Sequence, residues 1–158
     1  MRFVLLTAAL AVAESATELT ADTWDALIDA HTGEPYVWGV KFHSKMCGSC
    51  KELIPAWEAL QSSQSGLHWG EVNIDRKENI PLASKFGVLD EGIPNIKLFT
   101  AGGEAVPLLT GDMIGEAALT GDSATDAQIL SDAVEHTLTD NRLTAAKRDE
   151  SGNYRFEL

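Results

Sequence analysis

The stretch PYVWGVKFHSKMCGSCKELIPAW, residues 35–57, joins an apolar β-type segment directly to a helical one. Residues 35–43 are rich in β-branched and aromatic side chains, which predicts a strand buried on both faces. Over residues 47–63, apolar residues recur at helical spacing, and a proline inside this segment is expected to bend the helix. Cys47 and Cys50 therefore stand where a buried strand ends and a helix begins.

The segments on either side predict one α/β domain with a mixed sheet, covering residues 16–138. Strand–helix–strand order before residue 75 implies parallel pairing, and a short glycine-containing loop further along favours an antiparallel hairpin. The expected elements are, in chain order, a strand at 17–20, a helix from Thr20 or Asp22 to about Gly33, a strand at 35–43, a helix at 47–63, a strand at 67–75, a helix at 79–86, strands at 94–100 and 105–110, an irregular surface stretch at 109–125, and a helix with Ile129, Leu130, Val134 and Leu138 on its apolar face. Residues 139–158 are polar and charged, and we expect a flexible tail.

Composition and the first residues limit the compartment and the partners. The chain has 158 residues and a formal net charge of −12, so nucleic acid and anionic membrane surfaces would repel it. Residues 1–15 combine a positive start with an apolar run and small residues, which predicts a secretory signal peptide. The run is shorter than the roughly 18 to 20 apolar residues that span a bilayer. We therefore expect a mature chain without a membrane anchor, in an oxidising compartment where a cysteine pair can cycle.

The placement of the cysteines predicts disulfide chemistry. Unpaired backbone N–H groups and the dipole at a helix N-terminus stabilise a thiolate, which favours Cys47 as the nucleophile. Cys50 lies one turn further into the helix, where it can resolve a mixed disulfide between Cys47 and a substrate. Gly48 and Ser49 keep the intervening turn small and leave room for a polypeptide substrate.

Two other interpretations of the Cys-x-x-Cys pair remain open. Structural zinc sites use the same spacing but need four ligands, and two of the four histidines, His68 and His136, have no ligand-like spacing with the cysteines. An inert pair, either two buried thiols or a fixed short-loop disulfide, is the other alternative. The strand-to-helix placement favours redox chemistry, so we expect neither a bound metal nor a cofactor.

The chain resembles a thioredoxin-fold domain of the protein disulfide isomerase type over residues 17–138. The resemblance rests on four blocks: VKFHSKMCGSCK at 40–51, VNID at 72–75, SKFGV at 84–88 and IPNIKLF at 93–99. It implies the α/β thioredoxin fold, with a central mixed β-sheet flanked by helices on both faces. It also implies that Cys47 attacks, that Cys50 resolves, and that a cis-Pro94 turns the backbone of Ile93 toward an extended substrate.

Several departures from the isomerase pattern bear on the kind of redox work. Ser49 stands where the isomerases commonly carry His, so we expect Cys47 to be less acidic and its disulfide less oxidising. Met46 replaces the usual tryptophan, and the arginine that follows the last strand in many isomerase domains is not evident. Lys41 stands where many members carry a buried acid. It could transfer protons if burial lowered its pKa, or its side chain could extend to solvent at the sheet edge.

The chain ends in RFEL, residues 155–158, which resembles the Lys-Asp-Glu-Leu type of endoplasmic-reticulum retrieval signal. We therefore expect residence in the endoplasmic reticulum lumen, with secretion as the alternative. The predicted function is thiol–disulfide exchange by a monomer on cysteine-containing folding proteins or peptides, with glutathione or an upstream redox partner restoring the pair. The alternative is a binding or chaperone module of the same fold with little turnover.

Overall fold

The computed structural model describes residues 15–28, 37–64, 66–99, 105–115, 117–139, 146–148 and 154–156. The expected signal peptide, apart from residue 15, lies outside these ranges, as do the expected end of the first helix near Gly33 and the last two residues of the chain. Among the described residues, no helix combines the length and the apolar character needed to cross a membrane.

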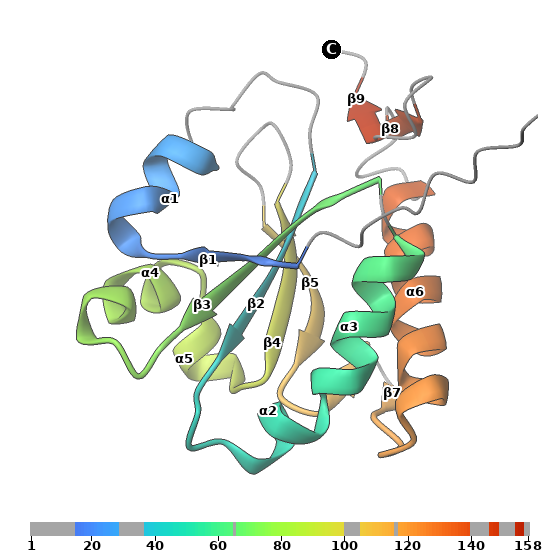
Figure 1. The fold of residues 1–158 in the computed structure, drawn as a ribbon, viewed down its shortest axis with the longest axis horizontal. Coiled ribbons are helices and arrows are strands. Elements are labelled where there is room, and N and C mark those ends of the chain that lie inside the picture. Colours follow the sequence, from blue (N-terminus) through green and yellow to red (C-terminus); the bar gives the residue numbers. More distant parts are fainter. Residues whose placement is uncertain are drawn as a thin grey trace, which may run out of the picture.

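A mixed sheet runs through the centre of the molecule in the strand order β1-β3-β2-β4-β5-β6-β7 (Figure 1). β3 pairs in parallel with β1 and β2, whereas β4 runs antiparallel to β2 and β5. The bounds are β1 Thr17–Leu19, β2 Trp38–His43, β3 His68–Asn73, β4 Asn95–Phe99, β5 Ala105–Thr110, β6 Met113–Ile114 and β7 Ala117–Ala118. The predicted change from parallel to antiparallel pairing is confirmed, and the cysteine-bearing end of β2 lies in the middle of the sheet.

Helices cover both faces of this sheet (Figure 1). Apolar side chains of α3 and α6 form one core cluster with β4 and β5, and those of α1, α4 and α5 form a second cluster with β2 and β3. The bounds are α1 Ala21–Leu27, α2 Gly48–Glu52, α3 Ile54–Ser63, the 3₁₀ turn η2 Lys77–Asn79, α4 Ile80–Lys85, α5 Val88–Glu91 and α6 Ser123–Thr139. The predicted α/β architecture, a central mixed sheet with helices on both faces, is therefore confirmed.

Strand alternation decides which central side chains face the cysteines. Val40, Phe42 and Val72 are fully buried in the cluster that contains α1 and α4. Because successive side chains on a strand point to opposite faces, Lys41 of β2 and Glu71 of β3 point to the α3 face. The parallel register places these two residues directly beside each other.

Gly39 makes room for the packing of α3 on the sheet. A Cβ atom at Gly39 would lie 2.2 Å from Cζ3 of Trp69, so the backbone of β2 can approach this ring only without a side chain. Trp69 meets Trp57 of α3 edge-on, with 5.1 Å between ring centroids, and its indole N–H donates to the carbonyl of Gln64 at 3.1 Å. This edge-to-face contact between the two indoles holds α3, and with it the neighbouring α2, against the centre of the sheet.

Local sequence explains the start of α1 and the break between α2 and α3. The Thr20 side chain accepts a hydrogen bond from the Thr23 N–H, and the Thr23 hydroxyl oxygen accepts one from the Thr20 N–H, so Thr20 closes the start of α1. The helix predicted over residues 47–63 is divided at Leu53, and Pro55 lies in the first turn of α3. A proline lacks the N–H that a helix interior needs, and the predicted bend is confirmed.

Some short elements differ from the sequence expectation. The stretch 109–125, expected to be irregular, contains β6 and β7, which extend the edge of the sheet. α5 is also unexpected and follows Gly87, whose positive φ of 74° is a conformation that glycine adopts without strain. In the expected tail, β8 Ala146–Arg148 pairs with β9 Tyr154–Phe156. These five elements, of two to four residues each, carry no periodic pattern of their own, and the sequence did not indicate them. Flexibility of the tail stays a prediction.

Candidate active site

Cys47 and Cys50 form a disulfide at the carboxyl end of β2, with their Cα atoms 5.2 Å apart. Cys47 is the N-cap residue of α2 and is partly exposed, whereas Cys50, one turn later, is only 4% exposed. This placement follows from the sequence, because the buried strand ends just before the pair and the helix begins between its members. The predicted difference in exposure is confirmed, and an attacking thiol reaches the sulfur of Cys47 more easily than that of Cys50.

Three polar groups surround the sulfur of Cys47. The Cys50 N–H donates to Cys47 Sγ at 3.1 Å, the Ser49 hydroxyl oxygen lies 3.4 Å away, and the Ile93 carbonyl oxygen lies 3.9 Å away. The peptide bond between Ile93 and Pro94 is cis, as the resemblance implies. An N–H donor and a hydroxyl next to the sulfur would stabilise the thiolate in the reduced protein.

The approach to Cys47 is open on the side of the turn. No atom lies within 4 Å of a Cβ atom built at Gly48, and the neighbouring Met46 is 87% exposed. Gly48 and Ser49 are both exposed, which is the property that the sequence predicts for the turn. Binding of substrate at Gly48, Ser49, Ile93 and Pro94 stays a prediction.

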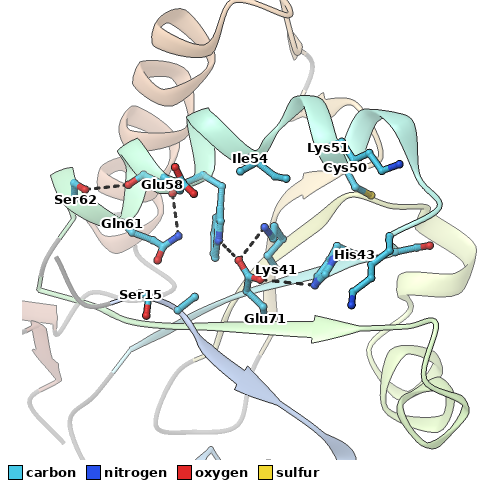
Figure 2. Close-up of a pocket in the computed structure, with 14 residues that line it drawn as sticks. Ser15, Lys41, His43, Cys50, Lys51, Ile54, Glu58, Gln61, Ser62 and Glu71 are labelled. Carbon is cyan, nitrogen blue, oxygen red and sulfur yellow. Dashed lines mark hydrogen bonds and ion pairs between the residues drawn. The ribbon is translucent and has the colours of Figure 1, made fainter.

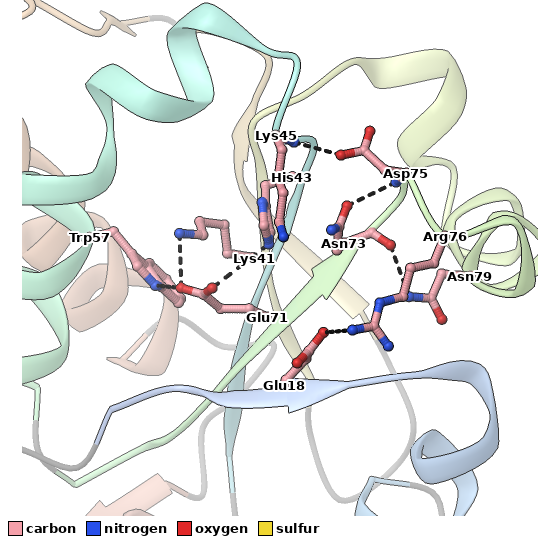
Figure 3. A network of polar contacts seen from close by, with 10 residues as sticks. All are labelled: Glu18, Lys41, His43, Lys45, Trp57, Glu71, Asn73, Asp75, Arg76 and Asn79. Atoms are coloured by element: carbon pink, nitrogen blue, oxygen red, sulfur yellow. Dashed lines mark hydrogen bonds and ion pairs between the residues drawn. The ribbon is translucent and has the colours of Figure 1, made fainter.

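A carboxylate at the end of β3 holds the loop that precedes Cys47 (Figure 3). Asp75 accepts a hydrogen bond from the Ser44 hydroxyl at 2.6 Å and another from the Lys45 N–H at 2.8 Å. The Ser44 hydroxyl oxygen in turn accepts from the Met46 N–H at 3.0 Å. The hydrogen bonds from Ser44 and Lys45 lower the pKa of Asp75 below its ordinary value.

Four side chains gather on the α3 face and form what we call the Glu71 cluster: Lys41, His43, Trp57 and Glu71 (Figures 2 and 3). The Lys41 ammonium lies 2.9 Å from Glu71 Oε1, the Trp57 indole N–H donates to the same oxygen at 2.6 Å, and His43 Nε2 lies 3.7 Å from Glu71 Oε2. The Lys41 side chain is 4% exposed and that of Glu71 is 30% exposed. The expectation that Lys41 extends to solvent at the sheet edge is therefore wrong, because the in-register carboxylate pairs with it inside the protein.

A cavity of about 690 Å³ connects this cluster to Cys50. Cys50, Lys41, His43 and Glu71 line it (Figure 2), as does Trp57. The site of the predicted chemistry therefore has two sides: an open side at Cys47 and a recessed side where Cys50 faces charged groups.

The surroundings of His43 lower the pKa of its imidazole below the ordinary value. Burial lowers the pKa of its imidazole first, the nearby Lys41 ammonium lowers it further, and the carboxylates of Glu71 and Asp75 oppose the shift. At neutral pH, the ring is therefore mainly in its neutral form, in which one nitrogen can accept a proton.

The structure brings most of the predicted site residues together at Cys47: Cys50, Gly48, Ser49, Ile93 and Pro94. Lys41 lies beneath them in the Glu71 cluster, and its proposed proton transfer stays a prediction. Sequence reasoning missed Glu71 and the place of His43 in the cavity. The one available signal is the alternation along β2 and β3, which puts these residues on the face opposite Phe42 and Val72. Within the described residues, no group of three or more His, Cys, Asp or Glu side chains is arranged to hold a metal ion.

Comparison with known proteins agrees with this geometry. Residues 15–118 match the family model of thioredoxin. Mouse protein disulfide-isomerase A6 is 37% identical over 89 residues, which cover 54% of this chain and 19% of the relative. Barley protein disulfide-isomerase is 32% identical over 97 residues, covering 59% of this chain and 18% of the relative. Rice protein disulfide isomerase-like 2-1 is 33% identical over 96 residues, covering 60% of this chain and 25% of the relative.

The chain thus spans a quarter or less of the length of these curated relatives. Among solved structures, the J-Trx1 fragment of ERdj5 superposes with a TM-score of 0.54 at 24% identity, covering 77% of this chain and 51% of that one, which shows a shared fold. Because the thioredoxin family model matches residues 15–118 and protein disulfide isomerases are among the curated relatives that match this chain, the chain belongs to the thioredoxin family and is homologous to protein disulfide isomerases.

Proposed function

We propose that the chain is a thiol–disulfide oxidoreductase of the secretory pathway that acts on cysteines of folding proteins or peptides through its CGSC motif, residues 47–50. The observation that carries this proposal is the disulfide between a partly exposed Cys47 and a buried Cys50 at the start of a helix. An exposed sulfur with an N–H donor beside it is a good electrophile when oxidised and a good nucleophile when reduced.

The exchange runs through a mixed disulfide on Cys47. In the oxidising direction, a substrate thiolate attacks Cys47 Sγ, the bond between Cys47 and Cys50 breaks, and Cys50 leaves as a thiolate that takes up a proton. A second substrate thiolate then attacks the substrate sulfur of the mixed disulfide, and Cys47 leaves as a thiolate. The substrate loses two electrons and the cysteine pair gains them. Oxidised glutathione or an upstream disulfide carrier would restore the pair, and the reverse sequence of steps reduces a substrate disulfide.

The surroundings of Cys47 support a less oxidising pair than that of an isomerase with His before its second cysteine. Ser49 lies 3.4 Å from the sulfur and can donate one hydrogen bond but carries no charge. A less stabilised thiolate makes the reduced form less favourable and the disulfide harder to reduce. We therefore propose that the reduction potential of the pair is more negative than that of isomerases with His at this position.

The test is the equilibrium reduction potential of the pair, measured across a series of glutathione buffers by trapping thiols with a mass-shifting alkylator. A potential near about −180 mV would indicate an oxidase or isomerase, and one near about −270 mV a reductase. A Cys50→Ser variant should accumulate mixed disulfides on Cys47, and a Cys47→Ser variant should form none. Failure to observe any reversible dithiol would refute the oxidoreductase proposal.

A second candidate, a binding module with little turnover, is favoured by exposed apolar side chains near the pair. Met46 is 87% exposed beside Cys47, and Ile54, which lines the cavity, is 43% exposed. Such side chains can contact an extended, partly unfolded client. If this is the main function, a Cys47→Ser/Cys50→Ser variant would bind a reduced, unfolded client protein as tightly as the wild type does. A loss of both client binding and exchange would favour the enzyme.

We also propose residence in the endoplasmic reticulum lumen, based on the apolar N-terminal run of residues 1–15 and the RFEL terminus at 155–158. The test is the distribution of the full chain, tagged after residue 15, between cells and medium. Deletion of the last four residues should move the protein into the medium; an unchanged distribution would remove the retrieval signal from the proposal.

A further inference from the structure

The recessed side of the site poses a chemical problem for Cys50. When this residue resolves a mixed disulfide, its thiol must first lose a proton, because only the thiolate attacks. Cys50 is 4% exposed, and the loss of water around a buried thiol disfavours its charged form. Unlike Cys47, it does not stand at a helix N-cap. A nearby proton acceptor would therefore speed resolution.

The cavity contains one side chain suited to this task. His43 and Cys50 line the same cavity, and in the view of Figure 2 the His43 ring is drawn between Cys50 and the Glu71 carboxylate. The His43 side chain is 20% exposed, so a proton that reaches the ring can pass on to water. Its Nε2 atom lies 3.7 Å from Glu71 Oε2, and Glu71 is itself held by Lys41 and Trp57.

We propose that His43 accepts the proton of Cys50 when Cys50 resolves a mixed disulfide on Cys47, and that Glu71 positions the His43 ring. The inference deepens the proposed thiol–disulfide exchange and rests on it. It assigns the proton transfer to an imidazole on β2 and gives Lys41 the role of holding the positioning carboxylate.

Resolution consists of one proton transfer followed by one exchange of sulfur–sulfur bonds. The Cys50 thiol gives its proton to the neutral His43 ring, and the resulting thiolate attacks Cys47 Sγ. The bond between Cys47 and the substrate sulfur breaks, the disulfide between Cys47 and Cys50 forms, and the substrate leaves as a thiolate. His43 then releases its proton to water or to that thiolate. Over this step and the preceding attack of Cys47 together, the cysteine pair loses two electrons and the substrate disulfide gains them.

The charged groups around His43 fit this role. Burial and Lys41 keep the ring mainly neutral at neutral pH, and the Glu71 carboxylate stabilises it once it is protonated. The charged side chains that face His43 or line the same cavity come from both sheet and helices: Lys41 and Lys45 on β2 and the loop after it, Glu71 and Asp75 on β3 and the turn after it, and Lys51 and Glu58 on α2 and α3.

The test separates the attack of Cys47 from that of Cys50. The reduced full-length protein is mixed in a stopped-flow instrument with a symmetric aromatic disulfide whose two halves are coloured thiolates, a nitrothiobenzoate dimer. The first thiolate is released when Cys47 attacks the probe, and the second when Cys50 attacks Cys47. In a His43→Ala variant, we expect the first release to keep its rate and the second to slow by about ten-fold or more at neutral pH. The second release should become equally fast in the wild type and in His43→Ala at a pH well above the ordinary thiol pKa of about 8.5, because Cys50 then ionises without a base.

Two further variants keep the proposal open to refutation if removal of the ring disturbs folding. His43→Gln keeps a polar side chain but provides no base, and it should show the same selective loss. Free imidazole should restore the second release in His43→Ala, because the cavity is open to solvent at this residue. His136→Ala, at an exposed position on α6, is the matched control and should behave as the wild type.

Glu71→Gln provides the test of positioning. It should slow the second release less than His43→Ala does and move its pH midpoint, whereas a purely structural role would change both releases together. The proposal is overturned if His43→Ala releases both thiolates at wild-type rates, or if the second release stays slow at high pH and imidazole has no effect. Absence of a second release in the wild type would instead refute the proposed exchange itself.

Discussion

Removal of the Glu71 charge should lower the free energy of unfolding more than removal of the Lys41 charge with which it pairs. The Lys41 side chain is 4% exposed, so without Glu71 its ammonium would remain inside the protein with no counter-ion. Glu71→Gln keeps an oxygen to accept from the Trp57 N–H, and it should lower the free energy of unfolding by about 3 kcal/mol, the lower end of the range for breaking a buried pair. Lys41→Met should cost only about 1 kcal/mol, because Glu71 is 30% exposed and keeps its hydrogen bond from Trp57.

The double variant Lys41→Met/Glu71→Gln removes both charges and should cost about 1 to 2 kcal/mol, well below the sum of the single changes. Urea unfolding at neutral pH, followed by circular dichroism, gives all four free energies and a coupling energy of about 2 to 3 kcal/mol. The pair between Arg76 and Glu18, with side chains 44% and 60% exposed, is the matched control. Its coupling should stay below about 1 kcal/mol. Additive costs of Lys41→Met and Glu71→Gln, within about 0.5 kcal/mol, would refute the reasoning.

Two other predictions concern the sheet and the loop before the cysteines. Asp75→Asn should destabilise the protein at neutral pH, because the lowered pKa of Asp75 means that its stabilisation is present above the unfolded value and is lost as pH falls through the folded one. Urea titrations should therefore show that the difference in the free energy of unfolding between Asp75→Asn and the wild type disappears in acid. A difference that persists there would contradict the stabilising role of the Asp75 carboxylate. Gly39→Ala should cost about 2 kcal/mol or more, because its Cβ would lie 2.2 Å from Trp69 Cζ3. Gly48→Ala, where the space is open, should change the thermal midpoint little, and equal losses at both glycines would contradict this view of the packing.

The parts of the fold that could be predicted are those with long, repeated local signals. The strand ending at His43 follows from its β-branched and aromatic composition, and the helix beginning beside Cys47 follows from its apolar spacing. The switch to antiparallel pairing follows from the length of the loop between two predicted strands. α5, β6 and β7 could not be found this way, because these three short segments form through contacts with their neighbours rather than through a pattern of their own.

The cysteine side of the site could be predicted for the same reason, because Cys47 and Cys50 carry their spacing within one motif. The Glu71 cluster could not. Lys41 and Glu71 are far apart in the sequence, and they meet only because β2 and β3 pair in a register that neither strand specifies alone. From Lys41 in isolation, an exposed ammonium is the ordinary expectation for a lysine, and the in-register carboxylate overrides it.

β3 holds a carboxylate near each half of the cysteine pair. Asp75, just beyond its carboxyl end, secures the loop before Cys47, and Glu71, four residues earlier, lies in the cavity lined by Cys50. A graft of the CGSC turn onto another domain of this fold would leave both carboxylates behind. To move this chemistry into a new scaffold, an engineer would need to transplant β3 together with the turn and preserve the strand alignment between them.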